Sequence, residues 1–179
     1  MHLLHCSRGD LDGSLAIFLE KNVKNVPPYA ILSHRWRDDE VTFRDCDGVP
    51  NLSSNPQIVN KTGYKKLEGA CSRAVQDGLS HIWIDTCCIN KSDSAEISEA
   101  INSMYSWYEL SQICYAYLYD VSASQDPKLK ESQFRRSDWF TRGWTLQELV
   151  TPTRVVFFDA MWQMTPKLAC WMPSMALPE

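Results

Sequence analysis

Glycine is scarce in this sequence, and the glycine-rich signatures of nucleotide-binding loops are missing. The chain has seven glycines in 179 residues, with neither a G-x-G-x-x-G nor a G-x-x-x-x-G-K-[ST] pattern. Dinucleotide binding of the Rossmann type and ATP hydrolysis through a Walker motif are therefore disfavoured. The patterns G-x-S-x-G and H-E-x-x-H are also absent. Only four histidines occur, and their scattered positions do not indicate a Ser-His-Asp triad.

Neither a basic surface nor a membrane-spanning segment is indicated. The formal net charge is −4 and the pI is about 5.6, so we expect no general attraction to nucleic acid or to anionic membranes. No apolar run approaches the roughly 20 residues that a membrane-spanning helix needs. With 44% hydrophobic and 22% charged residues, the composition is typical of one globular domain.

The cysteines indicate a reducing compartment. They are odd in number and irregularly spaced, and the N-terminus lacks the pattern of a signal peptide. We therefore predict a cytoplasmic protein with free thiols. Nothing gives Cys87 and Cys88 a zinc-binding spacing, so we interpret them as small core residues, with a redox or metal switch as the alternative. In a strand, His5 would point away from His2 and Cys6, and we predict no metal site.

Strand-like and helix-like segments alternate along the chain. Short apolar runs predict strands at 1–4, 29–32, 81–84, 113–119 and 154–160. Helical periodicity predicts helices at 64–75, at 93–108 with an Asp93–Glu96 capping box, and around Trp144, while 44–61 is interpreted as a loop. Strands that are apolar on both faces favour a parallel sheet covered on both sides. We therefore predict an α/β fold, a flavodoxin-like three-layer sandwich with a mostly parallel central sheet.

Two polar motifs follow predicted strands, where ligands bind in such sheets. After strand 29–32 comes the motif Ser33-His34-Arg35-Trp36, in which Arg35 suits phosphate oxygens and Trp36 offers a stacking face. A charged loop with one buried tryptophan is the alternative. After strand 81–84, Asp85 could hold a ribose hydroxyl or an arginine, or could simply cap a turn.

The segment 140–150 places Glu148 four residues after Trp144, on the same face of a helix. The indole could then shield the carboxyl group from water, so that the group retains a proton or binds a hydroxyl. An amphipathic helix with a solvated glutamate is the alternative. Arginines also alternate with aromatic residues in 134–144. This patch could suit single-stranded nucleic acid, but a single pyrophosphate fits its size and the acidic chain better, with an exposed helix start as the alternative.

Three long stretches closely resemble the HET (heterokaryon incompatibility) domain of filamentous fungi. They are PPYAILSHRW (27–36), the segment 63–121, and SDWFTRGWTLQELVTPTRVVFFDAMW (137–162). The resemblance implies a HET domain over 1–162 and a short irregular tail, 163–179. It also implies an effector of vegetative incompatibility, the regulated cell death that follows fusion of genetically different fungal cells.

The HET family in turn resembles, distantly, the TIR domain, a flavodoxin-like fold of immune signalling that cleaves NAD in many members. A TIR glutamate lies on the helix after the third strand in a W-x-x-x-E-[LI]-V context, which residues 144–150 match at Glu148. Ser33 matches a serine-containing turn after the first strand. Asp85 loosely matches an acidic loop after the second.

This resemblance implies that NAD is a substrate, cleaved at its nicotinamide–ribose bond, and that no cofactor is retained. Glu148 would hold the ribose hydroxyls and stabilise the oxocarbenium charge. Trp36 or Trp144 would stack on the ring, while Arg35 and Arg142 would bind the pyrophosphate. The alternative is a non-enzymatic signalling module that associates with itself or a partner protein, in which Glu148 is structural and pairs with an arginine such as Arg35.

Overall fold

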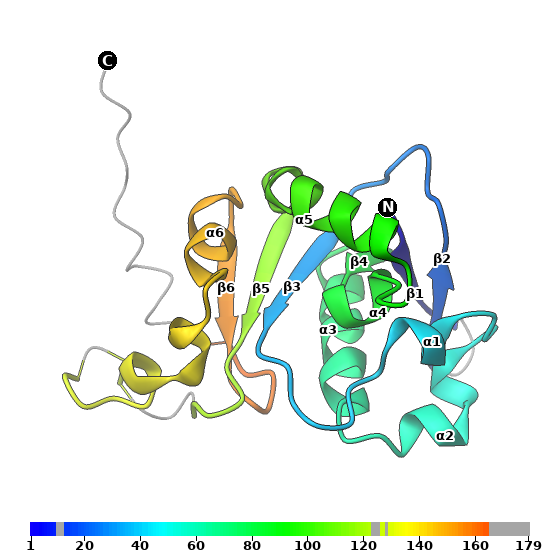
Figure 1. Cartoon of the computed structure of the whole chain (residues 1–179). Coiled ribbons are helices and arrows are strands. Elements are labelled where there is room, and N and C mark those ends of the chain that lie inside the picture. The colour runs from blue at the N-terminus through cyan, green and yellow to red at the C-terminus, as the bar shows by residue number, and fades with distance from the viewer. Residues whose placement is uncertain (10–12, 123–125, 128, 165–179) are drawn as a thin grey trace.

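A six-stranded sheet forms the centre of the protein. The computed structural model describes residues 1–9, 13–122, 126–127 and 129–164 (Figure 1). The strands of these described residues are Leu3–Arg8 (β1), Leu15–Glu20 (β2), Ala30–His34 (β3), His81–Trp83 (β4), Ile113–Tyr117 (β5) and Val155–Phe158 (β6). They lie side by side in the order β2-β1-β4-β3-β5-β6.

The sheet is mixed but mostly parallel. β3 pairs in parallel with β4 on one side and with β5 on the other, and β6 extends the parallel part beyond β5. β1 runs antiparallel to both β4 and β2. The chain therefore has an α/β fold in which helices flank a mixed sheet, as the alternating pattern predicted, with an antiparallel hairpin at one edge.

The strand β2 was not predicted from the sequence. Its residues, LAIFLE, are rich in leucine, alanine and glutamate, which favour helices over strands in isolation. It pairs with β1 along its whole length, from Leu3↔Glu20 to Arg8↔Leu15, and it buries Ile17 completely. Long-range pairing therefore decides the conformation of this segment.

Six α-helices and three short 3₁₀ helices are found among the described residues. The α-helices are Phe43–Cys46 (α1), Pro56–Val59 (α2), Tyr64–Gln76 (α3), Asp85–Cys88 (α4), Ser94–Glu109 (α5) and Thr145–Val150 (α6). The 3₁₀ helices are Leu52–Ser54 (η1), Phe134–Arg136 (η2) and Asp138–Thr141 (η3). The prediction that 44–61 is a loop was wrong, because α1, η1 and α2 form there, the last two capped by Asn51 and Asn55.

The two faces of the sheet are covered by different helices (Figure 1). On one face, Trp83 of β4 packs against Trp107 and Tyr108 of α5. On the other face, Arg8 of β1 donates a hydrogen bond to Ser72 of α3. Successive side chains of a strand point to opposite faces, so each strand contributes to both layers of the core.

The predicted N-terminus of α5 is confirmed, but its capping box is not. The Asp93 carboxylate accepts hydrogen bonds from the N–H groups of Ala95 and Glu96, as an N-cap residue does. The Glu96 carboxylate instead accepts from the Asn90 N–H at 2.8 Å. The second half of the box therefore ties the preceding loop to the helix.

The described cysteines are unpaired core residues. Cys87 and Cys88 are free and buried in the core, as we interpreted them, and so are the other four described cysteines. Cys170 lies outside the described residues, as do residues 165–179 of the predicted tail. Within the described part of the chain, no helix is long and apolar enough to cross a membrane.

Candidate functional site

A cavity of about 720 Å³ opens where β3 and β4 end, with α5 along one side. Ligand sites in α/β sheets lie at this edge, beside the strand where the order of the sheet reverses. That strand is β3, because the chain adds β4 on one side of it and β5 on the other. Of the residues predicted from the sequence, those that line the cavity are Arg35, Trp36, Asp85, Arg142, Trp144 and Glu148. Ser33 lies behind this lining, fully buried.

Glu148 is the centre of a buried polar network. Its side chain is almost completely buried, yet Arg142 donates two hydrogen bonds to it, at 2.7 Å to Oε2 and 3.1 Å to Oε1. Ser33 donates from Oγ to Glu148 Oε2 at 2.5 Å. The indole N–H of Trp139 in turn donates to Ser33 Oγ at 2.8 Å. The sheet, η3 and α6 are thus joined at one carboxylate.

The helix that carries Glu148 is shorter than expected. One helix was expected to carry both Trp144 and Glu148, but η3 ends at Thr141 and α6 begins only at Thr145. Trp144 is therefore the N-cap of α6, and its carbonyl accepts the Glu148 N–H at 3.1 Å. Trp144 is 46% exposed. The Glu148 carboxylate thus lies in a polar network, and the apolar shield that we expected is not its main environment.

The two arginines have different partners from those predicted. Arg142 forms the ion pair with Glu148, a contact that was assigned to Arg35 in the non-enzymatic alternative. Arg35 donates instead to the Asp138 carbonyl at 3.1 Å and to Thr141 Oγ1 at 2.9 Å. Arg35 therefore fixes the segment that leads to Arg142.

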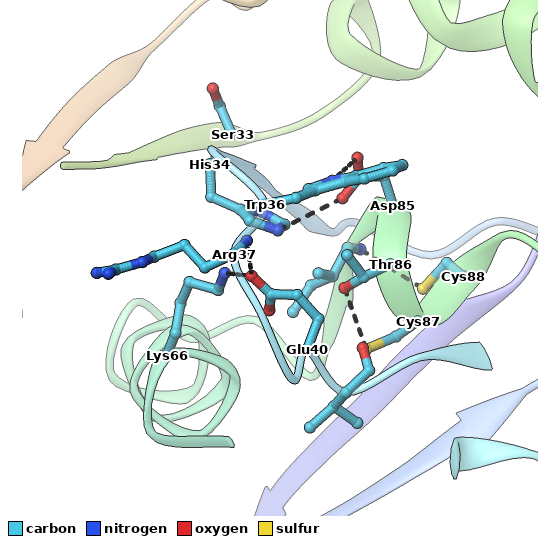
Figure 2. Close-up of polar contacts among 12 residues, drawn as sticks. Ser33, His34, Trp36, Arg37, Glu40, Lys66, Asp85, Thr86, Cys87 and Cys88 are labelled. Carbon is cyan, nitrogen blue, oxygen red and sulfur yellow. Dashed lines mark hydrogen bonds and ion pairs between the residues drawn. The ribbon is translucent and has the colours of Figure 1, made fainter. Parts of the chain in front are cut away.

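Asp85 lies after the end of β4 and is the first residue of α4. Trp36 donates from its indole nitrogen to Asp85 Oδ2 at 2.7 Å (Figure 2). The Lys91 ammonium lies over the Trp36 ring, 3.1 Å from its centroid. Burial raises the pKa of Asp85 to about 6, and the Trp36 hydrogen bond and the charge of Lys91 offset only part of that rise.

His34 points to the other side of β3 from Ser33 (Figure 2). It is buried, and its Nε2 lies 3.6 Å from Asp85 Oδ1, which is too long for a hydrogen bond. Burial, followed by the charges of Lys66, Arg142 and Lys91, lowers the pKa of His34 well below its usual value. Its ring is therefore neutral beside Asp85 at physiological pH.

Sequence reasoning did not assign site roles to three residues of this region. Trp139 was noted only as part of an aromatic and basic patch, and His34 only as part of the motif after β3. Lys91 was not considered, although it lies three residues after Cys88, in the loop that follows α4. The positive charge of Lys91 close to the end of β4 is the sequence signal that could have suggested a site role for this residue.

The sequence around this cavity is similar to that of a known protein family. Residues 29–133 match the family model described as heterokaryon incompatibility protein (HET), which is more than half of the chain. The chain belongs to the HET family. Among HET relatives, the vegetative incompatibility protein HET-E-1 of Podospora anserina is 49% identical over 142 residues. The match covers 75% of this chain and 10% of that protein. No solved structure matches the chain.

The HET match divides the candidate site. Ser33, Arg35, Trp36 and Asp85 lie inside the matched residues 29–133, whereas Glu148 and the rest of its segment follow them. The cavity therefore combines the strand ends of the matched HET region with a helix beyond it. The chain spans about a tenth of the length of the HET relative.

Proposed function

We propose that this HET-family chain is a cell-death effector of fungal vegetative incompatibility and that its cavity cleaves NAD. The observation that supports this proposal is the buried Glu148 carboxylate, held by Ser33 and Arg142 at the wall of a cavity of about 720 Å³. Cavities of 300 to 1,000 Å³, roughly, are typical of small-molecule sites. The name of the relative HET-E-1 supports the incompatibility role.

The order of the parallel strands supports a flavodoxin-like and TIR-like fold. Counted from β3, the four parallel strands lie in the order second, first, third, fourth. This is the order in which flavodoxin-like sheets begin, and those sheets bind ligands beside the first strand. Glu148 follows the third of these strands, as the catalytic glutamate of TIR enzymes does in the resemblance described above.

Glu148 is the proposed catalytic residue. A carboxylate has about four lone-pair sites. Three of them accept hydrogen bonds from Ser33 and Arg142. The remaining site, on Oε1, is proposed to accept a hydroxyl of the nicotinamide ribose, and the negative charge stabilises the oxocarbenium ion.

The reaction proceeds by breaking the bond between the ribose C1′ and the nicotinamide nitrogen. The bonding pair leaves with nicotinamide, and water forms the new bond to C1′. The proposed acceptor of the water proton is Asp85, which with a pKa of about 6 is mostly ionised at neutral pH. Trp144, with its exposed indole face, is proposed to stack on the nicotinamide ring. Because Arg142 is held by Glu148, Arg35 and Lys91 are the better candidates for the pyrophosphate.

The test is nicotinamide release from NAD by the purified chain, at concentrations high enough for it to assemble. Wild type is expected to release nicotinamide and Glu148→Gln to lose the activity by at least about a hundredfold, because the amide lacks the negative charge. Glu109→Gln, which changes an exposed residue of α5, is the matched control and is expected to resemble wild type. A wild-type rate no higher than that of Glu148→Gln would remove the enzymatic proposal.

The second candidate function is self-association without catalysis. The observation that favours it is a group of exposed apolar side chains on α5 and α6, which are neighbours in the fold: Tyr105, Leu146 and Val150. If this function holds, Leu146→Glu abolishes cell killing and Glu148→Gln kills like wild type. Under either function we place the protein in the cytoplasm, because its described cysteines are free thiols.

A further inference from the structure

Three potential metal ligands meet on the sheet at the start of β4, whereas the Glu148 cavity lies past the end of that strand. They are His5 of β1, Glu20 of β2 and His81 of β4, and one donor atom from each lies within 4.8 Å of the other two. His5 is directly opposite His81 in the antiparallel pairing of β1 with β4. Glu20 is opposite Leu3, two residues from His5 on the same face. Three neighbouring strands therefore bring their side chains to one point.

The spacing of Glu20 and His81 already suits a transition metal. His81 Nε2 lies 3.4 Å from Glu20 Oε2. Two ligands of a tetrahedral zinc ion, each at about 2.0 to 2.1 Å, are about 3.3 Å apart. The other nitrogen of His81, Nδ1, lies 2.9 Å from the hydroxyl oxygen of Ser80. Such a contact fixes the ring of a metal-binding histidine and leaves the opposite nitrogen for the metal.

His5 is held in place by rings, and it lacks a competing polar contact at Nδ1. Its ring stacks on Phe18, with centroids 4.6 Å apart, and meets the ring of His81 edge-on at 5.1 Å. Among the described residues, the buried Nδ1 of His5 has no hydrogen-bond partner.

We propose that His5, Glu20 and His81 bind one divalent transition-metal ion, of which Zn²⁺ fits best. Two imidazoles and one carboxylate are a zinc ligand set, with the fourth position open to water. Nitrogen ligands disfavour Mg²⁺ and Ca²⁺, which take oxygen. The site lies at the start of β4, whereas Asp85 follows the end of that strand. The metal therefore clamps the hairpin β1–β2 to the parallel part of the sheet and takes no part in the cavity chemistry.

The geometry explains why sequence spacing gave no indication of this site. His5 was compared with His2 and Cys6, its neighbours along the chain, and a strand separates those side chains. The actual partners of His5 are 15 and 76 residues away. Only the register of β1 with β2 and β4 brings them together.

The experiment measures Zn²⁺ and Co²⁺ binding to the purified chain after chelation and dialysis, in a reductant that contains no thiol. Wild type is expected to bind one equivalent of Zn²⁺ and to unfold at a higher temperature with the metal. Glu20→Gln and His81→Gln are expected to weaken the binding by at least about tenfold. Glu109→Gln, an exposed acid on α5, is the matched control and should bind like wild type.

The Co²⁺ spectrum tests the ligands without any substitution, in case a variant fails to fold. Nitrogen and oxygen ligands give visible d–d bands without a thiolate charge-transfer band. A thiolate band would overturn the proposal, because it would assign the metal to a cysteine. Absence of stoichiometric binding by wild type, or equal affinity of wild type and both cluster variants, would overturn it as well.

Discussion

Replacing Asp85 with asparagine is expected to stabilise the fold at neutral pH, although the same change removes a carboxylate from the cavity. The pKa of Asp85 rises from 3.8 to about 6 because the group is buried. The charged form is therefore less favourable in the folded protein than in the unfolded chain. Asparagine keeps an oxygen that can accept the Trp36 hydrogen bond, and it has no charge to bury.

The size of this effect follows from the pKa shift. The shift is about two units, and at about 1.36 kcal/mol per unit this amounts to roughly 3 kcal/mol. The attraction of Asp85 to Lys91 and Arg142 is already included, since both charges lower the same pKa. In a chain of this length, roughly 3 kcal/mol corresponds to an increase of about 6 to 12 °C in Tm.

The stability difference between wild type and Asp85→Asn should depend on pH. Because the pKa is raised in the folded state, the folded protein binds this proton more tightly than the unfolded chain. The contribution of Asp85 to stability is fully present below pH 3.8 and is lost as the pH rises through about 6. The advantage of Asp85→Asn should therefore be absent near pH 4, grow between pH 4 and 6, and stay constant above that range.

The assay is urea unfolding of wild type and Asp85→Asn across this pH range. Asp38→Asn, which removes the same charge from an exposed residue after β3, serves as the control and should change stability by less than about 0.5 kcal/mol. If Asp85→Asn is less stable than wild type at pH 7, or if its advantage does not depend on pH, the reasoning is refuted.

Three further substitutions test other contacts. Ser33→Ala should cost about 1 to 3 kcal/mol in urea unfolding, because it leaves a buried indole N–H without its acceptor. Gly69→Ala should lower Tm, since a Cβ there would lie 2.0 Å from the Trp162 ring nitrogen; a Tm equal to wild type would contradict this packing. Trp36→Phe should raise the pKa of Asp85 further, because the indole hydrogen bond lowers it, and carboxyl NMR titration would show the shift.

Local sequence patterns predicted the strands and helices whose residues are apolar or periodic along the chain. Apolar runs located β3, β4 and β5, and helical periodicity located α3 and α5. The rule that ligands bind at strand ends indicated Ser33 and Asp85, whereas Glu148 was indicated by its spacing from Trp144 and by the TIR resemblance. The strand and helix predictions are confirmed because burial and periodicity are properties of neighbouring residues.

The parts that the sequence did not reveal depend on pairing between distant segments. The segment β2 is a strand because it pairs with the edge of β1, and the same register brings Glu20 close to His5 and His81. Similarly, Arg35 was the arginine named as a partner of Glu148, and Arg142 was expected to bind a pyrophosphate, yet Arg142 forms the ion pair. The choice of Arg142 is made by η3, which turns the chain so that Arg35 binds its backbone instead.

The most direct test of the central claim is expression of wild type, Glu148→Gln and Glu109→Gln in one fungal host. Cell viability and total NAD should be scored in the same cultures. If Glu148 catalyses NAD cleavage and this cleavage kills the cell, viability and NAD should both fall when wild type or Glu109→Gln is expressed. Both should be preserved when Glu148→Gln is expressed. Killing by Glu148→Gln at the wild-type level, or killing by wild type with an undiminished NAD pool, would contradict the account.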